Sequence, residues 1–105
     1  MAGAKLVALY PHPTDIDMFL KDYEGHVRLT DTTLQVPEGA PKPYEVIRFV
    51  ETPQGKPAYF QMFVASFPSA EAMWQSLMSP GGQALAADAA RISSGGPPVF
   101  LFSVG

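Results

Sequence analysis

The chain contains no cysteine, and charged residues are scarce. The absence of cysteine excludes disulfides, thiolate nucleophiles and cysteine-ligated metal or iron–sulfur sites. Charged residues make up 16% of the 105 positions, against roughly 25% in average soluble domains. Seven Lys and Arg stand against ten carboxylates, so the chain has little positive charge for binding phosphates. We therefore expect no nucleic-acid partner.

Long apolar runs are absent as well. No segment approaches about 18 consecutive apolar residues, so we expect no membrane span. The start, Met1 to Tyr10, lacks the length and the small-residue cleavage site of a signal peptide, which predicts a cytoplasmic protein. One Trp, four Tyr and seven Phe exclude a disordered chain. The length predicts a single domain over residues 1–105.

Apolar periodicity and turn-forming residues predict the element order β-α-β-β-α-β. Thr14 is predicted to cap the first helix, and a polar loop is predicted from Thr30 to Pro43. Strands are predicted over 5–10, 44–51, 58–67 and 99–104, and helices over 15–27, 70–78 and 80–91. This order is typical of an α+β, ferredoxin-like subunit whose antiparallel sheet carries its helices on one face.

The predicted strands are apolar on both faces, whereas a sheet with one wet face alternates in polarity. Leu6–Leu9, Phe60–Phe67 and Val99–Phe102 show no alternation. A second copy of the chain is the simplest cover for the outer face. The pattern therefore predicts a homodimer in which two sheets close into an α+β barrel.

Two segments resemble the EthD family of dimeric α+β barrel proteins. The first runs from Tyr10-Pro-x-Pro through Asp15-x-Asp17-x-Phe19-x3-Tyr23-x2-His26, and the second from Phe67-Pro-Ser-Ala-Glu-Ala72 through Ser79-Pro-Gly-Gly-Gln-Ala84. The resemblance implies a homodimer with a cleft between sheet and helices. It also implies a role in degrading ethers, other xenobiotics or aromatic compounds, since relatives in the wider superfamily act on aromatic or polyketide-like molecules.

His26 is the main candidate for chemistry. It is predicted to lie at the end of the first helix, where the helix dipole favours a protonated imidazole and suits proton transfer. Tyr23, one turn earlier, is the candidate to align an oxygen of the substrate. The alternative for His26 is a solvent-facing residue that satisfies the last helix carbonyls.

Further residues are candidates for ligand binding. Tyr10 and His12 follow the first strand, and their alternatives are a core tyrosine and an exposed loop histidine. Met62, Phe67 and Trp74 are predicted to line an apolar pocket for a hydrophobic or aromatic small molecule. The same spacing is also typical of core or dimer-interface residues, and Trp74 is predicted to be mostly buried.

Several site classes are not predicted. Two histidines 14 positions apart without converging carboxylates are a weak metal signal, and capping explains Asp15 and Asp17. Neither a phosphate loop nor a nucleophile elbow is present, so no cofactor is expected. Three hypotheses remain open. The protein is a small cofactor-free enzyme, a carrier that assists a partner oxygenase, or a dimer that acts only in assembly.

Overall fold

The elements follow the predicted order, with the second helical segment divided in two. A computed structural model describes residues 3–104. The strands are β1 (Ala4–Tyr10), β2 (Tyr44–Arg48), β3 (Gln61–Phe67) and β4 (Val99–Val104), and the helices are α1 (Ile16–Thr33), α2 (Ala70–Met78) and α3 (Pro80–Ile92). No helix in this part of the chain is long and apolar enough to cross a bilayer.

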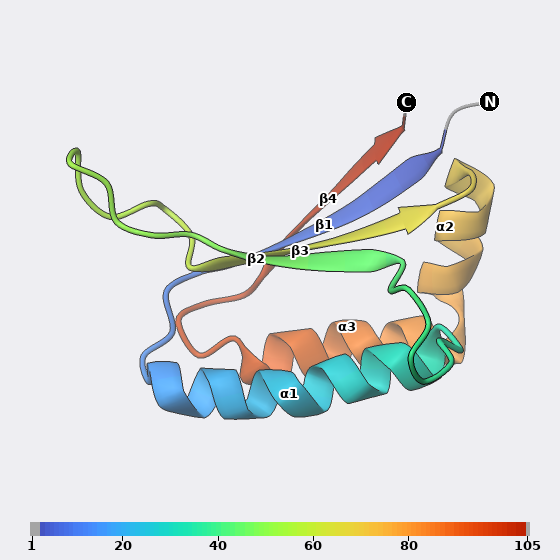
Figure 1. The fold of residues 1–105 in the computed structure, drawn as a ribbon, viewed down its shortest axis with the longest axis horizontal. Coiled ribbons are helices and arrows are strands. Elements are labelled where there is room, and N and C mark those ends of the chain that lie inside the picture. Colours follow the sequence, from blue (N-terminus) through green and yellow to red (C-terminus); the bar gives the residue numbers. More distant parts are fainter. Residues whose placement is uncertain (1–2, 105) are drawn as a thin grey trace.

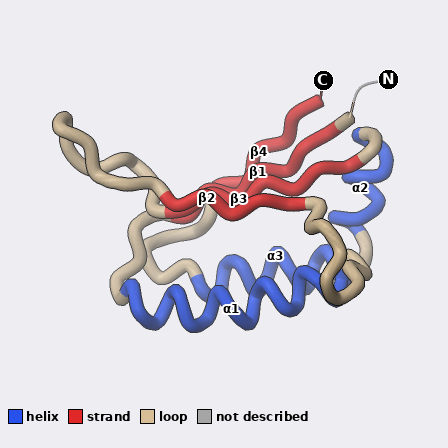
Figure 2. The backbone as a smooth tube through the Cα atoms, viewed as in Figure 1, coloured by secondary structure: helices blue, strands red, loops and turns tan. Residues whose placement is uncertain are grey.

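The four strands form one antiparallel sheet in the order β2-β3-β1-β4. All three helices lie on the same side of this sheet (Figures 1 and 2). Helices α1 and α3 run side by side beneath it, while α2 stands at one end of the strands (Figure 1). This arrangement confirms the predicted ferredoxin-like fold.

The sheet face turned away from the helices is mostly apolar. Side chains of a strand alternate between faces, and directly paired residues share one face. The register pairs Val7 with Val64 and Leu101. By the same alternation, the apolar residues of this outer face are Val7, Leu9, Ile47, Met62, Val64, Val99 and Leu101. No helix of the described chain covers them (Figure 1).

The core lies between the sheet and helices α1 and α3, and aromatic rings fill one end of it. Phe19 is 1% exposed, stacks on Tyr23 and meets the rings of Tyr10 and Phe60 edge to face. The buried apolar cluster consists of Ala8, Tyr10, Phe19, Tyr23, Phe60, Phe63, Ala65, Ala89 and Ile92. These contacts fix α1 against the sheet.

Helix α1 is longer than predicted, because the loop predicted from Thr30 begins only after Thr33. Threonines have low helix propensity, but here two of them bond within the helix. Thr30 donates to the His26 carbonyl (2.9 Å) and Thr32 to the Arg28 carbonyl (3.1 Å). Thr33 also packs where a Cβ on Gly81 of α3 would fall, at 2.8 Å from its Cγ2. These contacts keep the threonines at the end of α1 helical despite their low helix propensity.

Other predicted boundaries shift by a few residues. Asp15, not Thr14, caps α1, since its side chain accepts from the Met18 N–H at 3.1 Å. Strands β2 and β3 pair as a hairpin as predicted, but both are shorter than the sequence indicated. Residues 49–60 instead form an arm that projects from the sheet (Figure 2). Its tip contains an isolated bridge between Thr52 and Gly55.

The break between α2 and α3 depends on Ser79 and Gly82. Ser79 ends α2 and caps α3, accepting from the Gly82 N–H at 3.0 Å. A Cβ on Gly82 would lie 2.0 Å from the Ser76 carbonyl oxygen, so only glycine permits this close approach. Capping therefore explains the Ser-Pro-Gly-Gly segment, as the sequence favoured.

The prediction that Trp74 is mostly buried is wrong for the single chain. Its side chain is 46% exposed, and its ring lies 4.8 Å from that of Phe102 at the β4 edge of the sheet. The residue that α2 buries is its neighbour Met73, which is 1% exposed. The buried face of α2 therefore includes Met73 but stops short of Trp74.

We expect Phe19→Ala to lower the free energy of unfolding by about 3–5 kcal/mol, because it leaves a cavity among fixed rings. Met18→Ala is the matched control, since Met18 is 55% exposed and should change stability by less than about 1 kcal/mol. Urea unfolding followed by circular dichroism measures both variants. Equal losses would show that the aromatic cluster does not carry the core.

Candidate functional site

His26 and Asp88 form a hydrogen-bonded pair between the two long helices. Nδ1 of His26, in α1, lies 2.9 Å from Oδ2 of Asp88, in α3. His26 is 6% exposed. The other Asp88 oxygen accepts from Nε of Arg91, one turn further along α3, at 2.8 Å. The pair therefore joins α1 to α3 beneath the sheet.

This position corrects the sequence-based placement of His26. Helix α1 continues through His26 to Thr33, so the imidazole lies mid-helix and receives no benefit from a helix C-terminus. The alternative of a solvent-facing histidine is also wrong, because the side chain is buried. The partner of the imidazole is therefore Asp88 and not a helix terminus.

The carboxylate of Asp88 sets the imidazole tautomer. Burial alone would raise the pKa of Asp88, but the hydrogen bonds from His26 and Arg91 outweigh it and hold this pKa below its usual value. An ionised carboxylate only accepts hydrogen bonds, so Nδ1 of His26 carries the proton. When the ring is neutral, Nε2 is the acceptor, and within residues 3–104 no hydrogen bond reaches it.

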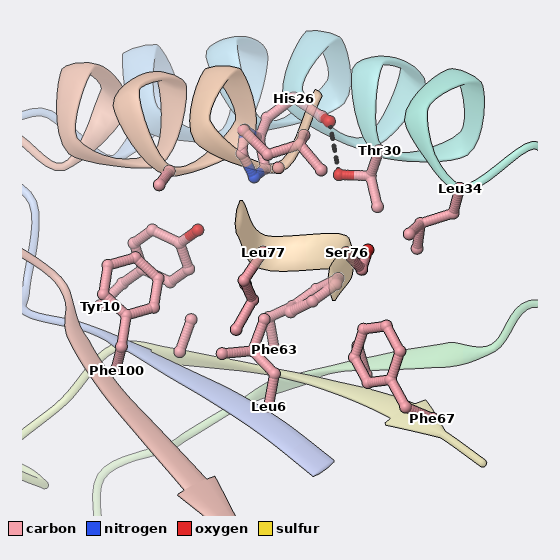
Figure 3. A pocket seen from close by; sticks show the side chains of 15 residues that line it. Leu6, Tyr10, His26, Thr30, Leu34, Phe63, Phe67, Ser76, Leu77 and Phe100 are labelled. Carbon is pink, nitrogen blue, oxygen red and sulfur yellow. Dashed lines mark hydrogen bonds between the residues drawn. The ribbon is translucent and has the colours of Figure 1, made fainter. Parts of the chain in front are cut away.

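The imidazole faces a cavity between the sheet and the three helices (Figure 3). Its volume is about 70 Å³. The residues that line it are Leu6, Ala8, Tyr10, His26, Thr30, Leu34, Phe63, Ala65, Phe67, Ser76, Leu77, Gly82, Leu85, Ala86 and Phe100. None of these described lining residues carries a fixed charge, so the cavity is apolar with a few polar groups at its walls.

Tyr10 brings a hydroxyl to the same end of the cavity. Its oxygen points toward the His26 ring, while Phe67 and Leu34 lie at the opposite end (Figure 3). Burial, with smaller effects from Tyr23 and Asp88 nearby, raises the pKa of Tyr10 far above its ordinary value. The phenol therefore stays neutral at physiological pH and can donate a hydrogen bond beside an acceptor imidazole.

Tyr23 lies beside His26 but outside the cavity. The two rings are 5.6 Å apart between centroids, yet Tyr23 is absent from the cavity lining and contributes to a separate groove between α1 and β2. Burial raises the pKa of Tyr23 to about 12, a shift that Gln61 partly opposes. Of the predicted tyrosines, the structure places Tyr10 in the cavity with His26.

Of the five predicted ligand residues, Tyr10 and Phe67 line the cavity, whereas His12, Met62 and Trp74 do not. Met62 points to the outer sheet face, because it pairs with Leu9 and Ile47 there. Trp74 packs on Phe102 outside the cavity.

The ring of His12 is hydrogen-bonded to the Pro57 carbonyl at 2.7 Å and lies edge to face on Phe60. This position is neither the exposed loop site nor a cavity site. His12 instead fastens the base of the 49–60 arm to the loop after β1. The sequence could not indicate this contact, because its partner is a backbone carbonyl 45 positions away.

Asp88 is the functional residue that the sequence analysis missed. It is the one charged residue between Gln83 and Ala90, in an otherwise Ala-rich helix. A lone carboxylate in such a segment signals a buried partner, since buried charges are paired. Within residues 3–104 no group of three or more His, Cys, Asp or Glu side chains could hold a metal ion.

The fold resembles several solved structures. An EthD family protein from Bacillus halodurans is 24% identical, with 96% of each chain covered and a TM-score of 0.78. A dimeric ferredoxin-like protein of unknown function from Jannaschia sp. is 13% identical over 98% of each chain, at a TM-score of 0.69. SnoaB, a cofactor-independent oxygenase from Streptomyces nogalater, is 10% identical, with 99% of this chain and 90% of that chain covered and a TM-score of 0.58.

These similarities confirm the fold and, at the level of fold, the resemblance to the EthD family that the sequence indicated. No family model and no curated protein matches the chain. At such identities the solved structures do not transfer an activity. The activity depends on the residues of the cavity and not on the fold alone.

We expect Asp88→Asn to lower the free energy of unfolding by about 1–3 kcal/mol near pH 7, since it removes two charge-assisted hydrogen bonds. Because the native pKa of Asp88 is depressed, its contribution is complete above the unfolded pKa of about 3.9 and is lost as the pH falls through the native pKa. In urea titrations from pH 7 down to about pH 2, the free energies of unfolding of the wild type and of Asp88→Asn should therefore converge.

Glu51→Gln is the control for this measurement, because Glu51 is exposed on the arm and should stay within about 0.5 kcal/mol of the wild type at each pH. A loss that is the same at both ends of the pH range would assign the effect of Asp88→Asn to packing instead of charge.

Proposed function

We propose that the protein is a small homodimeric enzyme of the EthD kind that moves a proton on a neutral hydrophobic or aromatic compound. The observation that carries the proposal is the 2.9 Å bond from His26 Nδ1 to Asp88, which turns the free Nε2 of a buried imidazole toward an apolar cavity. A general base needs an unprotonated nitrogen within reach of the substrate. Degradation of ethers or other xenobiotics is the proposed setting.

Each polar group of the cavity has a proposed role. His26 Nε2 accepts a proton from an acidic O–H or C–H group of the substrate, while Asp88 holds the ring and stabilises the imidazolium that forms. The neutral hydroxyl of Tyr10 donates to the oxygen on which negative charge develops. All of these groups belong to the chain itself.

The absence of charged lining residues favours neutral substrates, because a carboxylate entering the cavity would lose its hydration without a compensating cation. The size of the cavity sets a second requirement. About 70 Å³ is room for a few waters, whereas an apolar cavity of about 150 Å³ is known to bind benzene. An aromatic substrate therefore requires the cavity to widen.

A carrier is the second candidate function. The lining is almost entirely apolar, which is enough to bind a hydrophobic compound and hand it to a partner oxygenase. The two functions differ in whether His26 is needed after binding.

We expect the protein to accelerate solvent-deuterium exchange into a neutral 1,3-diketone such as acetylacetone, followed by proton NMR in D₂O. His26→Asn should reduce this acceleration roughly 10²–10⁴-fold. Asp88→Asn should reduce it as well, because an amide neither fixes the proton on Nδ1 of His26 nor stabilises the imidazolium. Circular dichroism should show both variants folded, although the buried position of His26 predicts some loss of stability.

Unchanged exchange in folded His26→Asn would contradict the proposed base. Binding of the diketone that persists without any exchange, in both the wild type and the variant, would support the carrier. Lys56→Gln serves as the neutral control, because Lys56 is exposed on the 49–60 arm, which contributes no residue to the cavity lining.

The proposed homodimer pairs the outer sheet faces of two copies. Seven apolar side chains share that face, and similar structures include a protein described as dimeric. An apolar sheet face of this extent exceeds what a monomer normally exposes to water.

We expect light scattering to give twice the chain mass of 11.3 kDa. Leu101→Asp, a change on the outer face at a residue 51% exposed in the single chain, should give the monomer mass at micromolar concentration. Met18→Asp should leave the dimer intact, because Met18 lies on the helix side of the molecule at the start of α1. A monomeric wild type would overturn the proposed pairing.

A further inference from the structure

The side chain of Leu77 extends from α2 into the cavity, toward the sheet. Tyr10 lies on one side of it and Phe67 on the other (Figure 3). Leu77 and Ser76 are the two residues that α2 contributes to the lining. The leucine therefore stands between the end of the cavity that holds His26 and the end formed by Phe67, and it fills space that the body of a ligand would need.

Gly82 of α3 fixes the backbone from which Leu77 projects. A Cβ on Gly82 would lie 2.8 Å from the Cα of Leu77 and 2.8 Å from its carbonyl oxygen. The two backbones can therefore touch only because the glycine has no side chain. Gly82 is buried and itself lines the cavity. This contact holds the last turn of α2 against the first turn of α3, so the place of Leu77 in the cavity is determined by the fold.

Leu77 differs from the other bulky side chains of the lining in how it relates to the core. The large lining residues of the sheet all belong to the buried apolar cluster or pack against it: Leu6, Tyr10, Phe63, Phe67 and Phe100. Leu77 is not among them, and α2 is held by the buried side chain of Met73. A change of size at Leu77 therefore alters the cavity while the aromatic cluster stays intact.

We propose that Leu77 is the specificity-determining residue of the cavity, and that it admits acyclic groups beside His26 while it excludes an aromatic ring. The cavity of about 70 Å³ has about half the volume of roughly 150 Å³ at which an apolar cavity binds benzene. Shortening Leu77 to alanine removes the branched end of the side chain from this space. His26 and Tyr10 keep their positions, because α1, α3 and β1 hold them.

For the reaction, this inference rests on the proposed function. A proton on the central carbon of a 1,3-diketone passes to Nε2 of His26, and a deuteron from the solvent later replaces it on the same carbon. The two groups that flank the diketone must then fit around Leu77. Acetylacetone carries a methyl group at each end, whereas benzoylacetone carries a phenyl ring at one end. Since one methylene in a hydrophobic pocket changes kcat/KM roughly 10–200-fold, the ring should be disfavoured at least about tenfold.

Binding of fluorobenzene, followed by ¹⁹F NMR, tests the limit on ligand size without any reaction. We expect Leu77→Ala to bind the ring at least about tenfold more tightly than the wild type. Leu77→Val is a smaller change that keeps the test open if the alanine variant does not fold, and its affinity should lie between the two. Leu20→Ala shortens a leucine of α1 that lies outside the cavity and should bind as the wild type does. Equal affinity of the wild type and the Leu77 variants, or an equal gain in Leu20→Ala, would overturn the proposal.

Deuterium exchange into the two diketones tests the same limit in the proposed reaction. Relative to the rates without protein, the wild type should accelerate exchange into acetylacetone at least about tenfold more than into benzoylacetone, and Leu77→Ala should reduce this ratio about tenfold. An unchanged ratio in folded Leu77→Ala would overturn the role of Leu77 and leave His26 as the base. Tighter binding of fluorobenzene by Leu77→Ala, without exchange into either diketone, would support the role of Leu77 and contradict the proposed base.

Discussion

The hydrogen bond between His26 and Asp88 is the interaction on which the interior depends. An imidazole in the middle of a buried helix face is costly unless its polar atoms are satisfied, and Asp88 satisfies Nδ1. The carboxylate is in turn compensated by Arg91 at the surface, so a chain of charge-assisted bonds runs from solvent to the cavity. The His26 imidazole at one end of the cavity thereby has a fixed tautomer in its neutral form, with Nε2 as the acceptor. The rest of its lining can remain apolar.

The placement of all three helices on one face of the sheet (Figure 1) divides the molecule into two apolar regions with different tasks. The helix side encloses the core, the cavity and the α1–β2 groove. The other side, around Val7 and Leu101, is left for a second copy in the proposed dimer. This division requires strands that are apolar on both faces. Strands whose side chains alternate in polarity would leave one face of the sheet exposed to water.

The fold could be predicted from sequence because its signals are local. Apolar periodicity, proline breaks and capping residues indicate each element within a few positions, and the β-α-β-β-α-β order then specifies the sheet. Where the prediction failed, a contact between distant segments decided the outcome. In the last turn of α1, Thr33 packs against Gly81, and no local signal encodes that contact.

The candidate site was less accessible to sequence reasoning for the same reason. His26 lines the cavity, but its partner Asp88 is 62 positions away, and the face on which Tyr23 lies depends on the rotation of α1. Tyr10 lies in the cavity because strand alternation puts it on the same face as Ala8. Tyr23 turns toward the groove instead. A short apolar run such as that of Met62 does not reveal which face points inward until the register is known.

The two ends of the cavity are formed by elements that differ in how deeply they are buried. His26 and Tyr10 are held by α1, α3 and the central strand β1, whereas Ser76 and Leu77 come from α2 (Figure 3). Met73 is the buried anchor of α2, and Trp74 and Met78 leave its other side largely exposed. A segment with few buried contacts opens at lower free-energy cost than the core does. If the proposed function involves an aromatic ligand, α2 is the element expected to move to widen the cavity, with the geometry of the His26–Asp88 pair unchanged.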